Sequence, residues 1–385
     1  MNVVLISNYL THHQLPFCKA VIKKYIDFTF IATEPIERER QLMGYVDMNK
    51  VYDFVFCAYE SEENKLKAKS ICDSCDALIT GSAPDHYFID RVKAGKLTIK
   101  YGERFFKKPF TASNTFRRIA SMWKHFIPYQ NNNYYLLCAS AFMPQDCHMF
   151  RCFENRMYKW GYFPETRTYA NISNLISMKE KRSILWAGRL IKWKHPEAAI
   201  EIATRLKKDN QDFVMSIIGN GEMESKLKMM INEYGLQNEV KLLGAMSPEK
   251  VRTYMEKSEV FLFTSDREEG WGAVLNEAMN SGCAVAAGSM IGAVPYLIND
   301  GINGMVFKDC DWDELYKKVN LIINDDCYRK KIAVNAYHTI TDLWCAEVAA
   351  DRLIKLVYAI LNHDTADIFD TGPCSKAEII KSGWY

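Results

Sequence analysis

The 385-residue sequence has no uninterrupted apolar run of roughly 18 residues, so no segment is predicted to cross a bilayer as a helix. It also has only one Cys-x-x-Cys pair, Cys72 and Cys75, with no second pair at the spacing of a four-ligand zinc site. The twelve cysteines are scattered, and no secretory signal is recognised before them. These absences favour free thiols in a reduced, cytoplasmic protein over a disulfide framework or a metal site.

A strong net charge is missing as well, because 49 basic and 47 acidic residues leave a balance of +2. The distribution is nevertheless uneven. The stretch from Arg91 to Lys124 contains ten basic residues interleaved with aromatic ones, and its single acid is Glu103. Such a mixture suits peripheral contact of residues 91–126 with an anionic surface on the cytoplasmic face of a membrane, with a solvated basic face as the alternative. Nucleic acid is not expected as a partner, since no nucleic-acid-binding module accompanies these residues.

Short apolar runs alternate with amphipathic, helix-like segments along the whole chain, which predicts parallel βαβ units in two doubly wound domains. The expected strands of the first half lie at 3–7, 28–32, 51–58, 77–80, 97–101 and 134–140, and those of the second half at 183–188, 213–219, 240–244, 260–265 and 284–288. The apolar periodicity lapses near Pro164. We therefore expect an α/β protein with domains at 1–165 and 166–342, a helix over 343–361 that packs back on the first domain, and a peripheral tail at 362–385.

In open α/β sheets, ligands bind beyond the carboxyl ends of the strands. After the expected strand 183–188 come Arg189 and Lys194, which could clamp a diphosphate, although a solvated turn is the alternative. After the strand 213–219 come Gly219, Asn220 and Gly221, which could let the backbone approach a ligand. A nicotinamide-binding fingerprint would need a third glycine, and position 224 is Glu, so a plain helix-entry turn is the alternative.

The stretch after strand 260–265 carries two carboxylates eight residues apart, Glu269 and Glu277. Between them, Gly270, Trp271 and Gly272 open a helix whose free amides form an anion site. Glu277 would lie about 10 Å along that helix from its start. This interval suits one ligand with hydroxyls at both ends and phosphates between them, that is, a nucleotide sugar. A surface glutamate beside a helix cap is the alternative.

In the first half, polar residues directly follow two of the expected strands. Asn8, His12 and His13 follow the first strand, and Glu103 and Arg104 follow the fifth. One of these could steer or deprotonate an acceptor hydroxyl, while loop caps and a salt bridge are the alternative.

The second half resembles the retaining glycosyltransferases of family 4, also called glycosyl transferases group 1, which have the GT-B fold. The resemblance rests on "AGRLIKWKHPEAAIEIA", "IIGNGEMESKL", "VKLLGAMSPEKVRTYMEKSEVFLFTS", "EEGWGAVLNEAMNSGCAVAAG" and "LINDGINGMVF", which cover most of 183–308. The first half is similar, more loosely, to members that build bacterial surface polysaccharides.

The resemblance implies two facing domains with a cleft between them, acceptor binding by the first and donor binding by the second. It implies that Arg189 and Lys194 bind the donor diphosphate, that Glu269 contacts the donor sugar and that Glu277 holds the ribose. The amides of Gly270 to Gly272 would lie near sugar and phosphate, and the backbone at Ala245 and Met246 near the base. It also implies that no metal and no cofactor is needed besides the nucleotide-diphosphate sugar.

The expected reaction is transfer of a hexose-type sugar, with retention, to a hydroxyl of a glycan or lipid-linked acceptor, in surface polysaccharide or glycolipid synthesis. Asn8 and His13 are the first-domain residues expected to line the substrate site, with Glu103 as the candidate acceptor-side catalyst. Two alternatives remain: a non-hydrolysing sugar-nucleotide epimerase, and a catalytically idle, membrane-associated partner subunit.

Overall fold

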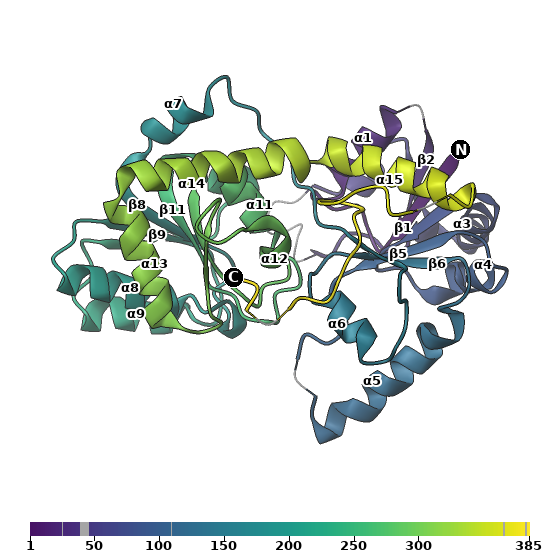
Figure 1. Cartoon of the computed structure of the whole chain (residues 1–385), viewed down its shortest axis with the longest axis horizontal. Helices are drawn as coiled ribbons and strands as arrows, with labels where there is room; N and C mark the ends of the chain where they lie inside the picture. Colours follow the sequence, from purple (N-terminus) through teal and green to yellow (C-terminus); the bar gives the residue numbers. More distant parts are fainter. Residues whose placement is uncertain (25, 39–45, 109, 365, 382) are drawn as a thin grey trace. The chain divides into compact units, whose positions relative to one another are not determined.

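The computed structural model describes residues 1–24, 26–38, 46–108, 110–364, 366–381 and 383–385. The chain divides into two compact units, which we describe separately (Figure 1). The first comprises Met1–Glu165 and Trp344–Ile380, and the second comprises Thr166–Leu343 and Lys381–Tyr385. In the described part of the chain, no helix combines the length and apolar character that crossing a membrane requires.

The first unit is built on a parallel seven-stranded sheet in the order β3-β2-β1-β4-β5-β6-β7. Its strands are β1 (Asn2–Ser7), β2 (Asp27–Ala32), β3 (Val55–Cys57), β4 (Ala77–Thr80), β5 (Thr98–Gly102), β6 (Tyr134–Cys138) and β7 (Met157–Lys159). The central strands are mostly apolar, because helices cover the faces of a doubly wound sheet. These helices are α1 (Leu15–Ile22), α3 (Glu62–Ser74), α4 (Ile89–Lys93), α5 (Ala112–His125), α6 (Met143–His148) and α15 (Ala346–Leu361).

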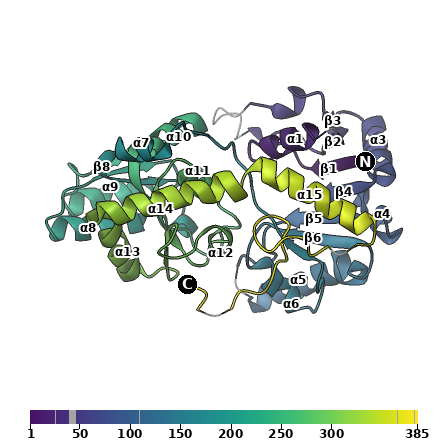
Figure 2. The same cartoon turned by 45° about the horizontal axis from the view of Figure 1, so that its top comes forward.

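The end of the chain completes this unit. Helix α15 buries Leu353, Leu356 and Val357 and packs against α1 (Figure 2). Beyond it, the residues around Cys374 continue the hydrogen bonding of β7: the amide of Lys159 donates to the carbonyl of Ser375 (2.7 Å), and the amide of Cys374 donates to the carbonyl of Lys159 (2.7 Å). The expectation of a peripheral tail at 362–385 is thus wrong for Cys374 and Ser375, which are buried beside an edge strand.

The second unit is a parallel six-stranded sheet in the order β10-β9-β8-β11-β12-β13. Its strands are β8 (Glu180–Ala187), β9 (Val214–Ile218), β10 (Val240–Leu242), β11 (Ser258–Phe263), β12 (Ala284–Gly288) and β13 (Met305–Phe307). Its helices are α7 (Ile172–Ser177), α8 (Glu197–Lys208), α9 (Glu224–Glu233), α10 (Pro248–Lys257), α11 (Ala273–Asn280), α12 (Val294–Leu297), α13 (Trp312–Asn324) and α14 (Asp326–His338).

The two doubly wound parallel sheets confirm the expected α/β class. The strands expected at 77–80 and 284–288 form over the expected residues, as β4 and β12. The run 51–58 is mostly not a strand, because Met48–Lys50 forms a short 3₁₀ helix capped by Asp47 and pairing begins only at Val55. Strands β7 and β13 were not predicted, since three-residue runs carry too little alternation to be recognised.

Candidate functional site

The second unit has its topological switch point between β8 and β11. These two strands pair directly, while the chain between them passes through β9 and β10 on the other side of β8. At such a point the loops that follow the two strands diverge to opposite faces, and ligands bind outside the carboxyl ends of the strands. The loops that follow β8 and β11 carry Arg189, Lys194 and Glu269, so the sheet brings these residues to one edge.

Hydrogen bonds join these two loops. The indole Nε1 of Trp186 donates to Oγ1 of Thr264 (2.8 Å), and that hydroxyl donates to the carbonyls of Lys194 (2.7 Å) and His195 (3.0 Å). The amide of Asp266 donates to the carbonyl of Trp193 (3.0 Å). The backbone that carries Lys194 is therefore fixed relative to the end of β11.

The side chains of Lys194 and Glu269 meet at this edge. Nζ of Lys194 lies 2.5 Å from Oε2 of Glu269, which also accepts from the hydroxyl of Ser265 (2.9 Å). Both members of the ion pair retain limited contact with solvent, with 13% and 12% of their side chains exposed. Arg189 is exposed, with its guanidinium 5.9 Å from the ring centre of Trp193, and no described side chain forms an ion pair with it.

His195 closes the same loop in an unusual backbone conformation, with φ of 46°. Its Nε2 lies 3.1 Å from Oδ2 of Asp266, and its Nδ1 lies 3.7 Å from Oε1 of Glu197. These carboxylates favour the imidazolium and raise the pKa of His195 to about 9, with Asp266 as the larger cause. Asp266 thus anchors the loop that presents Lys194.

Helix α11 begins directly after the glycine-rich turn. Gly272 precedes it with φ of 90°, and a Cβ there would lie 2.3 Å from the ring of Phe263, so only glycine fits. The side chain of Trp271 is fully buried and its Nε1 donates to Oδ1 of Asn276 (2.9 Å), so the indole belongs to the core. Only the backbone of Gly270 to Gly272 is left for the anion-binding role.

Glu277 lies on α11, partly buried. Burial raises the pKa of its carboxyl to about 7, against the opposing influence first of Arg252 and then of Arg167. The carboxyl is therefore poised to change its charge near neutrality, and a ligand that donates hydrogen bonds to it would favour the ionised form.

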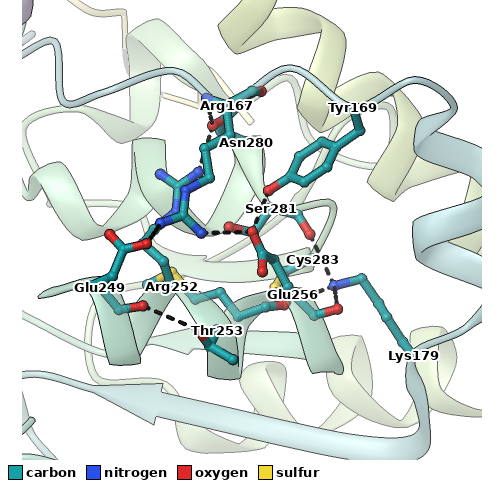
Figure 3. Close-up of polar contacts among 11 residues, drawn as sticks. Arg167, Tyr169, Lys179, Glu249, Arg252, Thr253, Glu256, Asn280, Ser281 and Cys283 are labelled. Carbon is teal, nitrogen blue, oxygen red and sulfur yellow. Dashed lines mark hydrogen bonds and ion pairs between the residues drawn. The ribbon is translucent and has the colours of Figure 1, made fainter.

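The carboxyl end of α11 is held by a polar network (Figure 3). The side-chain amide of Asn280 exchanges hydrogen bonds with the backbone of Arg167, at 2.8 and 3.0 Å, and its Oδ1 accepts from Arg252 (2.6 Å). The ammonium of buried Lys179 donates to the carbonyls of Met255 (2.7 Å), Glu256 (3.1 Å) and Ser281 (2.9 Å). These contacts fix α11, and with it Glu277, against the carboxyl end of α10.

Gly219 and Gly221 have a different role from the one expected. With φ of 145° and 151°, they pack on the backbone of the loop after β8: a Cβ on Gly219 would lie 1.8 Å from the carbonyl oxygen of Gly188, and one on Gly221 2.5 Å from that of Leu190. The carbonyl of Asn220 accepts from the amide of Leu190 (2.8 Å). The glycines thus let two loops approach each other. Ala245 and Met246 lie in the loop between β10 and α10, with Ala245 exposed and Met246 partly buried.

In the first unit, Glu103 accepts a hydrogen bond from the hydroxyl of Tyr162 (2.9 Å) and pairs with Lys107. His13 stacks on the same Tyr162 ring, with 5.8 Å between ring centres, beside a small, largely apolar pocket that Gln14 and Tyr101 also line. Asn8 is partly buried at the end of β1 and accepts from the hydroxyl of Ser7 (3.2 Å).

Arg104, the other expected acceptor-side residue, is buried and pairs with Asp146 at 3.1 Å. The other oxygen of Asp146 accepts from the amide of Phe106 (2.9 Å). Arg104 is therefore a structural residue, which corrects the expectation that it handles an acceptor. The salt-bridge alternative holds for Arg104.

Residues 171–339, most of the second unit, match the family model for glycosyl transferases group 1. This stretch is thus similar to a glycosyl transferases group 1 domain. A glycosyltransferase of Methanocaldococcus jannaschii whose activity is uncharacterized is 30% identical over 185 residues, which cover 48% of this chain and 47% of the relative. The chain thus spans about half the length of this curated relative.

A further relative is the Campylobacter jejuni N-acetylgalactosamine-N,N′-diacetylbacillosaminyl-diphospho-undecaprenol 4-alpha-N-acetylgalactosaminyltransferase. It is 32% identical over 156 residues, or 40% of each chain.

Solved structures extend the likeness of fold to both units. Anabaena HepE in complex with UDP has a TM-score of 0.67 and 15% identity, covering 93% of this chain and all of HepE. The pneumococcal O-GlcNAc transferase GtfA, in complex with UDP and GlcNAc, has a TM-score of 0.66 and 10% identity, covering 94% of this chain and 99% of GtfA. The chain therefore has the GT-B fold.

Sequence reasoning missed the residues that organise the site without facing a ligand. Thr264 and Asp266 hold the loop of Lys194, and Ser265 holds Glu269. Their position could have identified them, because they directly follow a buried strand, where polar side chains often cap loops.

Proposed function

We propose that the protein transfers a hexose-type sugar from a nucleotide-diphosphate donor to a hydroxyl of a glycan or lipid-linked acceptor, with retention of anomeric configuration. The observation that carries the proposal is the convergence of Arg189, Lys194 and Glu269 beside the start of α11, at the switch point of a unit that is similar to a group 1 domain. Cations and helix amides suit a diphosphate, and carboxylates suit sugar hydroxyls.

Each group has one role in this proposal. Arg189, Lys194 and the amides after Glu269 stabilise the negative charge that grows on the leaving diphosphate, so the step needs no metal ion. Glu269 accepts from hydroxyls of the donor sugar, and Glu277 accepts from the ribose. Glu269 forms an ion pair with the ammonium of Lys194, so a bound diphosphate would share that ammonium with the carboxylate.

The chemical step balances without a protein nucleophile. The bond between the anomeric carbon and the phosphate oxygen breaks, and the acceptor oxygen bonds to the same face of the anomeric carbon. The acceptor proton passes to an oxygen of the departing diphosphate. On the acceptor side, Glu103 is the candidate group in the first unit. His13 stacks on the ring of Tyr162, whose hydroxyl donates to Glu103. Asn8 lies in the loop after β1.

Product analysis tests this function. UDP-sugars are the first donors to screen, because HepE and GtfA are each seen in complex with UDP. With a lipid-linked or oligosaccharide acceptor, we expect a new glycoside and free nucleoside diphosphate, with the anomeric configuration of the donor preserved by NMR. A changed sugar nucleotide formed without acceptor would indicate an epimerase, and absence of donor binding would indicate an idle partner subunit.

A further inference from the structure

Three cations of the basic stretch at 91–126 serve the fold of the first unit. The guanidinium of Arg91 is buried and donates to backbone carbonyls, including those of Leu97 (2.9 Å) and Cys75 (2.8 Å). Lys100 donates to the carbonyl of Gly81 (2.5 Å), and Arg104 pairs with buried Asp146. The expectation that the whole stretch meets an anionic surface is therefore corrected. Helix α5 is the part of the stretch that we consider as a contact with such a surface.

One face of α5 is anchored to the unit. Met122 is 1% exposed and packs in the core cluster that also contains Phe106. The guanidinium of Arg118 lies over the rings of Phe106 (5.6 Å) and Phe110 (5.1 Å). Figure 1 shows α5 at the periphery of the first unit, beside α6. These contacts hold α5 in place and do not involve its exposed apolar side chains.

A different face of α5 is apolar and exposed. Phe116 is 86% exposed, Trp123 61% and Ile119 39%. At about 3.6 residues per turn, these positions fall within one stripe along the helix. Arg117 and Lys124, both exposed, project about 100° around the axis from this stripe, so they flank it on the solvent side.

The surroundings favour an anionic partner. Of the six cations between Glu103 and Asp146, Arg104 pairs with Asp146 and Lys107 with Glu103. The other four, Lys108, Arg117, Arg118 and Lys124, lie on or shortly before α5, and no acidic residue lies among them. A protein partner that only covered apolar side chains would not require this one-sided charge. Phenylalanine and tryptophan flanked by basic residues are the composition of helices that lie in the interface of an anionic bilayer.

We propose that α5 is a lipid-docking surface: Phe116, Ile119 and Trp123 enter the headgroup region of an anionic membrane, and Arg117 and Lys124 pair with its phosphates. The inference is independent of sugar transfer, because it concerns a surface of the first unit and no residue of the candidate donor site.

Flotation of the full-length protein with vesicles tests the proposal. We expect binding to phosphatidylcholine vesicles that contain phosphatidylglycerol, weaker binding to pure phosphatidylcholine, and loss of binding as salt screens the charges. The double substitution Phe116→Ser with Trp123→Ser should reduce binding by about tenfold or more, because burial of two aromatic side chains is lost. Arg117→Glu with Lys124→Glu should reduce binding to anionic vesicles alone.

Matched control variants distinguish binding through α5 from nonspecific binding of other apolar or basic surface residues to the vesicles. Leu66→Ser removes another exposed apolar side chain of the first unit, 72% exposed on α3, and should leave binding unchanged. Lys208→Glu with Lys317→Glu makes the same charge change on exposed lysines of the second unit. Circular dichroism and binding of UDP should be unaffected in every variant.

Two outcomes would overturn the proposal. One is binding to anionic vesicles that the α5 variants retain in full. The other is absence of vesicle binding together with concentration-dependent self-association that Phe116→Ser abolishes, which would assign the stripe to a second copy of the chain.

Discussion

Nζ of Lys194 and Oε2 of Glu269 lie 2.5 Å apart, although 75 residues separate them in the sequence. The pairing of β8 with β11 brings them together, and the hydrogen bonds of Thr264 hold their loops in place. In the proposed reaction, the donor diphosphate and the carboxylate of Glu269 therefore compete for the ammonium of Lys194. The two side chains should therefore have opposite effects on nucleotide binding and the same effect on turnover.

The first prediction separates those effects. Lys194→Met should weaken binding of a nucleoside diphosphate, because a cation is lost, whereas Glu269→Gln should strengthen it, because a competing anion is lost. Both should lower turnover of the sugar nucleotide by about 10²- to 10³-fold. Calorimetric titration and single-turnover assays measure the two quantities. Lys228→Met, which breaks an exposed ion pair on α9, is the control, and equal affinities in all variants would contradict the assignment.

The second prediction concerns Gly219. Gly219→Ala places a methyl group 1.8 Å from the carbonyl oxygen of Gly188, against rigid backbone, at φ of 145°. We expect a loss of about 3 kcal/mol or more in the stability of the second unit, together with loss of nucleotide binding as the Arg189 loop shifts. Gly235→Ala is the matched control: its φ is also positive, at 65°, and no atom lies within 4 Å of the added carbon, so it should cost about 1 kcal/mol. Thermal unfolding monitors both, and similar losses in the two variants would show that the loop contact is unimportant.

These two predictions show what the sequence could and could not supply. Arg189, Lys194 and Glu269 were predicted as site residues because they lie in the loops that follow buried strands, and the strand order brings those two loops to one edge of the sheet. The partner of Gly219 was not recognisable, because it is a carbonyl of a loop 31 positions earlier and backbone contacts leave no side-chain pattern. For the same reason the tail was misjudged: Cys374 and Ser375 dock on β7 through main-chain hydrogen bonds.

The third prediction uses the raised pKa of His195. Because the folded-state pKa of about 9 exceeds the ordinary value of 6.5, the ion pairs with Asp266 and Glu197 stabilise the fold fully below pH 6.5 and are lost as pH rises through 9. His195→Gly removes these pairs but also relieves the left-handed backbone. We expect it to destabilise the protein by about 2 kcal/mol at pH 6 and by little near pH 10.

Urea unfolding at several pH values measures this difference. His363→Gly is the control, since His363 is exposed and also left-handed, with φ of 59°, but has no ion pair in the described structure. It should change stability by less than about 1 kcal/mol at every pH. A pH-independent loss in His195→Gly would refute the charged interaction.

The fourth prediction concerns Glu277. Burial raises the pKa of its carboxyl to about 7. Ribose hydroxyls donate hydrogen bonds to the ionised form, so binding of a sugar nucleotide must remove the proton below that pH. The Kd for the sugar nucleotide should therefore rise about tenfold per pH unit as pH falls below 7. A sugar nucleotide is the appropriate probe because its diphosphate, esterified at both ends, does not titrate in this range.

Substitution makes that pH dependence diagnostic. Glu277→Gln should bind more weakly than the wild type at pH 8 and show a flat profile between pH 5 and 8. The same substitution should stabilise the free protein at pH 8, by up to about 3 kcal/mol, because the buried carboxylate is destabilising once ionised, and the gain should vanish toward pH 4.5. Glu233→Gln, on the exposed face of α9, should alter neither profile. If Glu277→Gln keeps the wild-type pH dependence of binding, the ribose is held by another group; if only the stability gain is missing, the carboxylate is better solvated than its burial indicates.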